Sequence, residues 1–440
     1  MRPDHTVFAF LACLALAGCG GRAEGVLTPD GLSAPGASQI ELMTLTTREA
    51  SPEPGFLFSG ERSSKLSLTD ITISIPPDRV RKIGEVQWPK KLPANPAVEF
   101  STMSVRPVDR TGARFWFRKE TKGRKRHVLL FVHGFNNTYE DAVYRFAQIV
   151  HDSGTEAVPV LFTWPSRGSV FAYNYDREST NYSRDALEEA LQELAKAPEV
   201  EDVSVLAHSM GSFLALESLR QMAIRNGRIA PKIRNVILAA PDVDVDVFRQ
   251  QLGEMGAPAE RPRFTIFTST DDRALLVSSR LAGRVPRLGA IDPKTEPYAS
   301  EFRTQKIDAF DLTDLQTDDR LAHGKFAESP EVVKAIGGRL VAGQQISDSE
   351  LSLGERVGQV ASGVASTAGS AAGVIINAPL AVVDPKVRRG YGDQLGQFGG
   401  NIDDAFSPLR PNLRRGAQAP AQAPTTSSAT SSPSKSATTR

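Results

Sequence analysis

The chain has 440 residues, 40% of them hydrophobic, and carries 52 lysines and arginines against 51 aspartates and glutamates. This is the composition of a folded globular protein. A formal net charge of +1 supplies neither the basic surface that attracts nucleic acid nor the acidic excess that keeps a chain unfolded. No nucleic-acid partner is therefore expected. The length fits two or three ordinary domains, or one α/β domain with extensions.

Residues 1–18 have the features of an export signal. Arg2 precedes an apolar run over residues 7–16, and small residues follow just before Cys19. The run is too short for a mature transmembrane helix. The sequence Leu-Ala-Gly-Cys at 16–19 resembles the lipobox of bacterial lipoproteins, which implies that Cys19 becomes the lipid-modified first residue. An ordinary secretory signal with a coincidental cysteine is the alternative.

The resemblance to lipoproteins also implies a location. Gly20 stands where lipoproteins retained in the inner membrane carry Asp, so the chain is expected at the bacterial envelope, lipid-anchored in the outer membrane and facing the periplasm. The second cysteine, Cys13, lies within the signal. The body of the chain therefore has neither a disulfide nor a thiolate metal site.

Composition divides the rest of the chain into four parts. The expected divisions are a flexible Gly/Pro/Ser-rich tether (19–38), a folded domain (39–340), a Gly/Ala-rich extension (341–414) and a disordered tail (415–440). Within the extension, residues 357–376 are uncharged and have small residues four apart. This spacing fits a helix packed on protein, a loosely ordered segment or a membrane-embedded helix.

The folded domain shows strands first and then strands alternating with amphipathic helices. Helices are predicted after the strand at 128–132, from Ser183, and from Met210 to about Ile224. This alternation predicts an α/β domain with a mostly parallel sheet covered by helices on both faces. The expected strands are 40–45, 71–75, 128–132, 158–163, 203–207, 236–240, 264–268 and 307–310.

The sequence Ala-His-Ser-Met-Gly at 207–211 joins an apolar strand to a helix. A serine in so sharp a turn projects its hydroxyl above the sheet, and the residues two before and two after it must be small because strand and helix crowd there. Ala207 and Gly211 meet that demand. The helix N-terminus also favours the negative charge that develops in acyl transfer. The alternative is that Ser209 only caps the helix.

In this context the motif resembles the nucleophile elbow of the α/β-hydrolase superfamily, with Ala207 in place of the first glycine of G-x-S-x-G. The resemblance implies an α/β-hydrolase fold with Ser209 as the nucleophile. The sequence His-Gly-Phe-Asn-Asn at 133–137 resembles the loop that helps to bind the oxyanion. Two backbone amides are needed, and those of Phe135 and Met210 are the candidates. For His133 itself a structural role is expected.

A general base and an acid complete the expected site. The superfamily orders its residues as nucleophile, acid and histidine, and His323 is the only one of six histidines downstream of Ser209. A histidine outside any site is the alternative. Asp272 follows the strand at 264–268, where the acid is usually found. Its neighbour Asp271 and the earlier Asp242, which occupies the position used by some lipases, remain open as alternatives.

Aromatic residues follow the strand at 158–163. Trp164, Tyr173 and Tyr175 are candidates to line a substrate pocket, because the C-terminal ends of parallel strands gather there. Core packing explains the same residues equally well. The sequence has no Gly-rich nucleotide loop and no clustered metal ligands, so no cofactor and no metal are expected.

Together the motifs at 133–137, 164–166, 207–211 and 240–242 resemble a bacterial branch of α/β hydrolases of unknown function, classed with esterases and lipases. The resemblance covers about residues 40–335. It implies a serine hydrolase that acts on a small-molecule or lipid ester or thioester. An acyltransferase with the same triad, and a catalytically silent fold used for binding or assembly in the envelope, are the alternatives. Nothing in the sequence indicates an oligomeric state.

Overall fold

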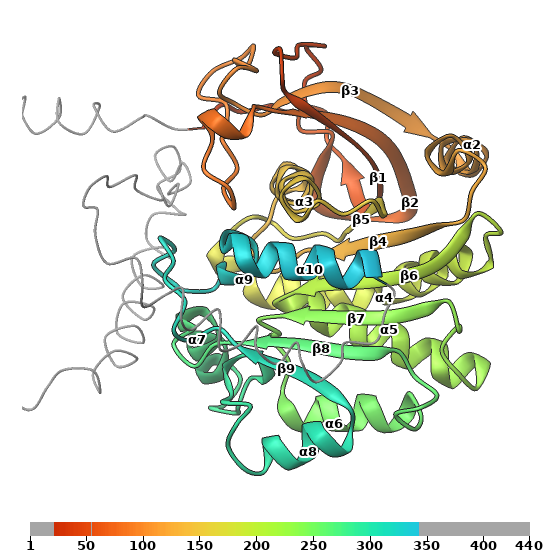
Figure 1. The fold of residues 1–440 in the computed structure, drawn as a ribbon, viewed down its shortest axis with the longest axis vertical. Helices are drawn as coiled ribbons and strands as arrows, with labels where there is room; N and C mark the ends of the chain where they lie inside the picture. The colour runs from red at the N-terminus through yellow and green to blue at the C-terminus, as the bar shows by residue number, and fades with distance from the viewer. Residues whose placement is uncertain (1–21, 54, 343–440) are drawn as a thin grey trace, which may run out of the picture. The chain divides into compact units, whose positions relative to one another are not determined.

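The computed structural model describes residues 22–53 and 55–342. Their strands form one sheet in the order β3-β2-β1-β5-β4-β6-β7-β8-β9 (Figure 1). Its first three strands pair antiparallel, and every other pairing is parallel, so the mostly parallel sheet is confirmed. The strands are β1 Ser38–Ala50, β2 Phe58–Ile75, β3 Ser101–Val108, β4 Arg126–Val132, β5 Val158–Thr163, β6 Val200–His208, β7 Ile233–Ala239, β8 Arg263–Thr268 and β9 Ile307–Asp311.

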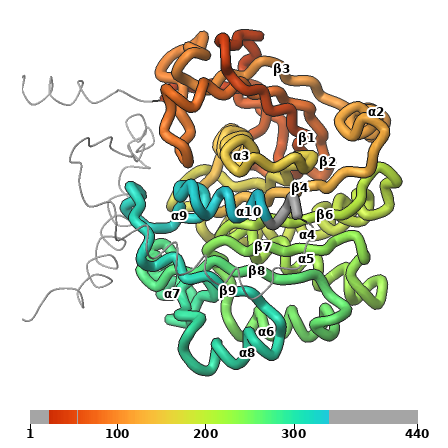
Figure 2. Tube along the Cα trace, in the orientation of Figure 1, coloured from red at the N-terminus to blue at the C-terminus, as the bar shows by residue number. Residues whose placement is uncertain are grey.

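Helices cover both faces of the sheet, as the alternating pattern predicts. In Figure 2, α3 and α10 lie on the near face, with α4 and α5 behind the sheet. The helices are α2 Arg110–Thr121, α3 Tyr139–Ser153, α4 Tyr173–Lys196, α5 Met210–Asn226, α6 Val245–Glu254, α7 Arg273–Leu281, α8 Tyr298–Thr304, α9 Lys325–Glu328 and α10 Pro330–Ala342.

Successive side chains of a central strand enter different cores. Leu130 of β4 belongs to the cluster that includes Leu191 of α4 and Leu214 of α5, whereas Phe131 belongs to the cluster that includes Phe146 of α3. All five side chains are buried. A strand with both faces covered shows a continuous apolar run rather than an alternating one, which is why residues 128–132 predict a buried strand.

The prediction that a helix begins at Ser183 is wrong. Helix α4 begins ten residues earlier, at Tyr173, and Ser183 is buried within it, where its hydroxyl shares a hydrogen bond of 2.8 Å with that of Thr47. The first turns of α4 lack an apolar stripe because their buried side chains, such as Asp176 and Ser179, are polar. Hydrophobic periodicity cannot detect a helix face of this kind.

Residues 22–37, which composition assigns to a flexible tether, pack against the domain instead. Val26 and Leu27 are buried. Arg22 forms ion pairs with Glu140 and Asp141 of α3. The Gly, Pro and Ser content reflects turns here, and the two apolar side chains and the Arg22 ion pairs anchor the segment.

Several sequence predictions concern residues outside the described ranges. These are the signal at 1–18, Cys19, most of the extension at 341–414, and the tail at 415–440. Within residues 22–53 and 55–342, no helix is both long enough and apolar enough to cross a membrane.

Candidate active site

Ser209 occupies a strained turn between β6 and α5. Its backbone has φ 53° and ψ −124°, a conformation that residues with a side chain rarely adopt. The end of β7 and the loop after it hold the turn: the Ser209 N–H donates to the carbonyl of Ala239 at 2.9 Å, and the Asp242 N–H donates to the carbonyl of Ser209 at 3.1 Å. The serine therefore sits at the C-terminal edge of the sheet in the geometry that the 207–211 motif predicts.

Two glycines allow the loop after β4 to lie directly against this turn. A Cβ on Gly211 would lie 2.2 Å from the carbonyl oxygen of His133, and one on Gly134 would lie 2.9 Å from the Cβ of Ser209. Any larger residue at either position would push the loop away. The segment that carries Phe135 is thus brought next to Ser209 and Met210.

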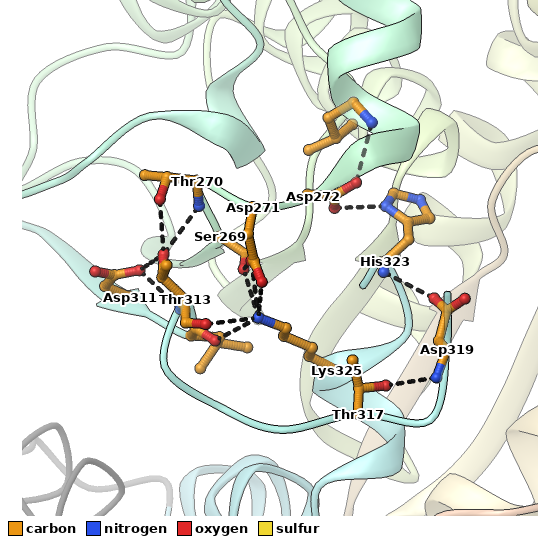
Figure 3. Close-up of polar contacts among 12 residues, drawn as sticks. Ser269, Thr270, Asp271, Asp272, Asp311, Thr313, Thr317, Asp319, His323 and Lys325 are labelled. Atoms are coloured by element: carbon orange, nitrogen blue, oxygen red, sulfur yellow. Dashed lines mark hydrogen bonds and ion pairs between the residues drawn. The ribbon is translucent and has the colours of Figure 1, made fainter. Parts of the chain in front are cut away.

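Asp272 and His323 are in direct contact, although 51 positions separate them in sequence. The Nδ1 of His323 lies 2.7 Å from an Oδ of Asp272 (Figure 3). The other carboxylate oxygen accepts the N–H of Leu275 at 3.0 Å and so caps α7. Asp272 is fully buried, so its carboxylate is fixed by these partners rather than by water.

The pKa of His323 is raised above the ordinary histidine value. Burial by itself lowers it, but the charge of Asp272 and the hydrogen bond to it outweigh burial, with smaller contributions from Asp242 and Asp319. Asp272 therefore makes the imidazole a better proton acceptor and fixes its Nδ1 as the protonated nitrogen. Nε2 is then free to act as a base.

The other two candidate acids have different partners. Asp271 turns toward Lys325, whose ammonium lies 2.8 and 2.9 Å from its two oxygens (Figure 3). Asp242 accepts hydrogen bonds from Tyr173 and Ser278 and lies 3.3 Å from the guanidinium of Arg287. Of the three aspartates, Asp272 alone contacts a histidine ring.

Asp319, which the sequence analysis missed, shapes the loop that carries His323. One of its oxygens accepts the N–H of His323 at 2.8 Å (Figure 3). The same oxygen accepts the N–H of Gly324 at 3.0 Å. Ala322, just before the histidine, has a φ of 54°. A carboxylate that binds consecutive backbone amides holds such a turn in place.

His208 links the serine turn to the histidine loop. Its ring centroid lies 4.7 Å from that of His323 and 4.5 Å from that of Phe326. Burial, together with the charge of His323, holds the pKa of His208 well below the ordinary value. His208 therefore stays neutral and packs beside His323 as an uncharged ring.

His133 has the structural role expected of it. Its ring is buried and stacks on Trp164 at 4.9 Å, and burial with the nearby charge of Arg48 lowers its pKa to about 3. The Nδ1 donates to the carbonyl of Gly134 at 2.8 Å, and Nε2 accepts the N–H of Trp164 at 3.1 Å. A permanently neutral histidine thus joins the loop after β4 to the loop after β5.

A buried arginine that sequence reasoning missed binds the same two loops. Arg48 of β1 is 1% exposed, and burial lowers its pKa to about 10. Its guanidinium donates to the carbonyl of Asn137 at 2.8 Å and to that of Ser166 at 2.7 Å. No carboxylate among the described residues forms an ion pair with Arg48. Its guanidinium instead donates hydrogen bonds to the carbonyl oxygens of the two loops.

Ser166 and Asp176 complete this network. The N–H of Asn137 donates to the Ser166 hydroxyl at 3.1 Å, and that hydroxyl donates to Asp176 at 2.5 Å. Asp176 also accepts from the backbone N–H of Asn136, whose φ is 58°. The Trp-Pro-Ser segment thus acts as a brace for the loop that carries Phe135. The only signal in the sequence for this role is that the Trp-Pro-Ser segment directly follows the strand β5.

The three aromatic candidates for a substrate pocket separate in the structure. Trp164 is fully buried beneath the loop, so it lines no pocket open to solvent. The hydroxyl of Tyr175 donates to Gly60, and its ring lies under the guanidinium of Arg167, which directs it toward β2. Tyr173 alone packs against the candidate oxyanion loop, in an edge contact with Phe135 at 5.4 Å.

One group of side chains in the described residues has metal-ligand spacing. Asp78, His151 and Asp152 have ligand atoms within 4.8 Å of one another. Arg81 already pairs with both of these aspartates, at 3.1 Å and 2.5 Å. The cluster is therefore a charge-compensated, partly buried network, and it contains none of the residues described above.

Two features are typical of an α/β hydrolase. One is a serine in a strained strand-to-helix turn at the edge of a mostly parallel sheet, and the other is an Asp–His pair on later loops. The family model described as "Alpha/beta hydrolase of unknown function (DUF900)" matches residues 109–339, more than half of the chain. The protein belongs to this family, and the predicted α/β-hydrolase fold is confirmed.

Individual relatives are distant. An uncharacterised protein of Nostoc sp., alr1448, is 28% identical over 123 residues, which cover 22% of this chain and 32% of that protein. The chain thus spans about a third of the length of this curated relative. A Pyrobaculum calidifontis esterase has 13% identity and a TM-score of 0.30, covering 78% of this chain and 95% of its own. The RedJ thioesterase of Streptomyces coelicolor has 16% identity and a TM-score of 0.27, covering 50% and 87%. Identity at this level transfers no activity.

The Asp272–His323 contact predicts a specific change in titration. In Asp272→Asn the pKa of His323 should fall, because burial is then opposed only by the smaller contributions of Asp242 and Asp319. Histidine ring signals followed by NMR across pH measure this. Asp271→Asn removes the same charge one residue away and should leave His323 nearly unchanged. A larger fall in the Asp271 variant would contradict the pairing.

Proposed function

We propose that the protein is a serine hydrolase that cleaves carboxylic esters or thioesters through an acyl-enzyme. The observation that carries this proposal is the hydrogen bond between the buried Asp272 and His323. The ring of His323 packs on that of His208, the residue directly before the strained turn at Ser209. If Asp272 and His323 formed only a structural salt bridge, no strained serine turn would be needed beside them. If Ser209 only capped α5, no histidine paired with a buried aspartate would be needed.

In the proposed reaction the Ser209 hydroxyl attacks the acyl carbonyl while Nε2 of His323 takes its proton. The carbonyl electron pair moves to oxygen, and the resulting anion is bound by the amides of Met210 and Phe135. Collapse expels the alkoxide or thiolate, which takes the proton from His323, and leaves an acyl group on Ser209. Water then attacks by the same route, with His323 as base, and releases the carboxylic acid.

The surroundings of the triad support this use. Asp272 raises the pKa of His323, so the base is protonated at acid pH and neutral above its raised pKa. Activity should accordingly rise with pH. The Arg48, Ser166 and Asp176 network fixes the loop of Phe135 before substrate arrives, and an oxyanion site is effective only when its donors are already in place.

We further propose that the chain works at the bacterial envelope, attached through a lipid on Cys19. The support is the lipobox-like sequence at 16–19 directly after the apolar run. Radiolabelled palmitate should label the wild-type chain in bacteria and fail to label Cys19→Ser. Equal labelling of both proteins would contradict lipid attachment at Cys19.

Ester hydrolysis tests the proposed function directly. The wild-type chain should hydrolyse 4-nitrophenyl esters of increasing acyl length, and Ser209→Ala should lower kcat by about 10⁴-fold or more. The rate should increase with pH through a pKa above 6.5 that belongs to His323. Asp272→Asn should lower kcat by about 10³-fold or more, far beyond the effect of Asp271→Asn or Asp242→Asn. An inactive wild type would instead favour a silent fold.

The brace under the candidate oxyanion loop predicts a selective loss of rate. Ser166→Ala removes the hydroxyl that links Asn137 to Asp176, so the loop amide should lose its alignment with the transition state. We expect kcat to fall about 10- to 100-fold with little change in KM. Ser169→Ala, in the same loop but outside the network, is the matched control. A raised KM with unchanged kcat, or equal effects in both variants, would argue against the brace.

A further inference from the structure

Arg177 lies one helical turn beyond Tyr173 on α4, beside the candidate site. Its guanidinium carbon sits 3.4 Å from the ring centroid of Phe213, which belongs to the first turn of α5, four residues after Ser209. Residues four apart share a helix face, so Arg177 and Tyr173 line the same side of α4. Tyr173 is the aromatic residue that packs on Phe135.

The surroundings of Arg177 are continuous with the serine turn. The hydroxyl of Tyr173 donates to Asp242 at 3.1 Å, and the N–H of Asp242 binds the carbonyl of Ser209. Phe135 and Tyr173 are therefore linked to the Ser209 turn through Asp242, and Phe213 follows Ser209 by four residues on α5. Arg177 contacts Phe213 and lies one helical turn from Tyr173.

Arg177 has no carboxylate partner among the described residues. Its guanidinium packs on the face of the Phe213 ring, and burial lowers its pKa. The two acids whose charges act on it, Asp242 and Glu217, bind other side chains: Asp242 binds Ser278 and pairs with Arg287, and Glu217 binds Gln251 at 2.7 Å. A guanidinium partly withdrawn from water without an anion is costly.

We propose that Arg177 binds an anionic group of the substrate, so that the preferred esters carry a carboxylate or phosphate a few atoms from the scissile carbonyl. The proposal rests on the proposed hydrolase function and adds the substrate class. A guanidinium presents several donors in one plane and binds carboxylate or phosphate through paired, charge-assisted hydrogen bonds. Its stacking on Phe213 fixes that plane before the substrate arrives.

The test compares charged and neutral esters on the full chain. The substrates are 4-nitrophenyl butyrate, mono-4-nitrophenyl glutarate with the anion on the acyl side, and 4-carboxyphenyl butyrate with the anion on the leaving group. Wild type should favour at least one anionic ester by about tenfold or more in kcat/KM over the neutral ester. Which anionic ester is favoured shows on which side of the carbonyl Arg177 acts.

Variants separate Arg177 from general charge effects. Arg177→Gln should abolish the preference mainly by raising KM for the anionic ester, with the neutral ester changed less than about twofold. Arg177→Lys should retain part of the preference. Arg184→Gln removes the same charge from α4 two turns further along and should behave as wild type.

Failure of the inference and failure of the proposed function give different results. If neutral esters are hydrolysed and Arg177→Gln leaves the anionic to neutral ratio unchanged, the anion site is wrong and the hydrolase stands. If no ester is hydrolysed, the hydrolase proposal fails. Calorimetric titration with monoethyl glutarate then decides the anion site alone: binding lost in Arg177→Gln supports it, and equal or absent binding in both proteins overturns it.

Discussion

The backbone turn at Ser209 is the constraint on which the rest of the site depends. A residue with a side chain is held at φ 53° because β6 must pass directly into α5, and hydrogen bonds to Ala239 and from Asp242 keep it there. Gly211 and Gly134 then permit the loop after β4 to lie within van der Waals reach of the turn. Strain of this kind persists only when the surrounding structure enforces it, and such strain concentrates at functional sites.

Much of the remaining polar interior serves to fix loops around that turn. Arg48, Ser166 and Asp176 hold the loop that carries Phe135, while Asp319 holds the loop that carries His323. These groups are buried or half-buried, and each forms at least one hydrogen bond with a backbone atom of a loop. Buried polar groups carry a desolvation cost that apolar packing does not. Their concentration at the C-terminal edge of the sheet is consistent with a site that must be rigid before it binds its substrate.

Sequence reasoning predicted the fold and the nucleophile turn because both follow from local patterns. Apolar runs of strand length predict the parallel sheet, and the small residues around Ser209 predict the turn. His323 followed from its position downstream of Ser209. Asp272 was preferred for its place after the strand at 264–268, but Asp271 and Asp242 could not be excluded. Each also follows a strand, and the partners that separate them, Arg287 and Lys325, come from distant segments.

Features that depend on polar contacts between distant parts of the chain could not be predicted from the sequence. Arg48 lies 89 or more positions from the loop residues whose carbonyls it binds, and nothing in β1 marks it as different from a solvent-facing arginine. The early start of α4 was hidden for the same reason, since its first turns bury polar side chains. Trp164 and Tyr175 follow β5 closely yet turn to the core and to β2, because side-chain direction in a loop depends on partners.

Covalent labelling of the full chain with a fluorophosphonate, followed by peptide mapping, tests the central claim that Ser209 is an activated nucleophile. The account predicts one modified site, on the peptide that contains Ser209, and no labelling of Ser209→Ala. Labelling should slow in His323→Gln, because the base that activates the hydroxyl is then absent. Equal labelling of wild type and Ser209→Ala, or an unlabelled wild-type protein, would contradict the account.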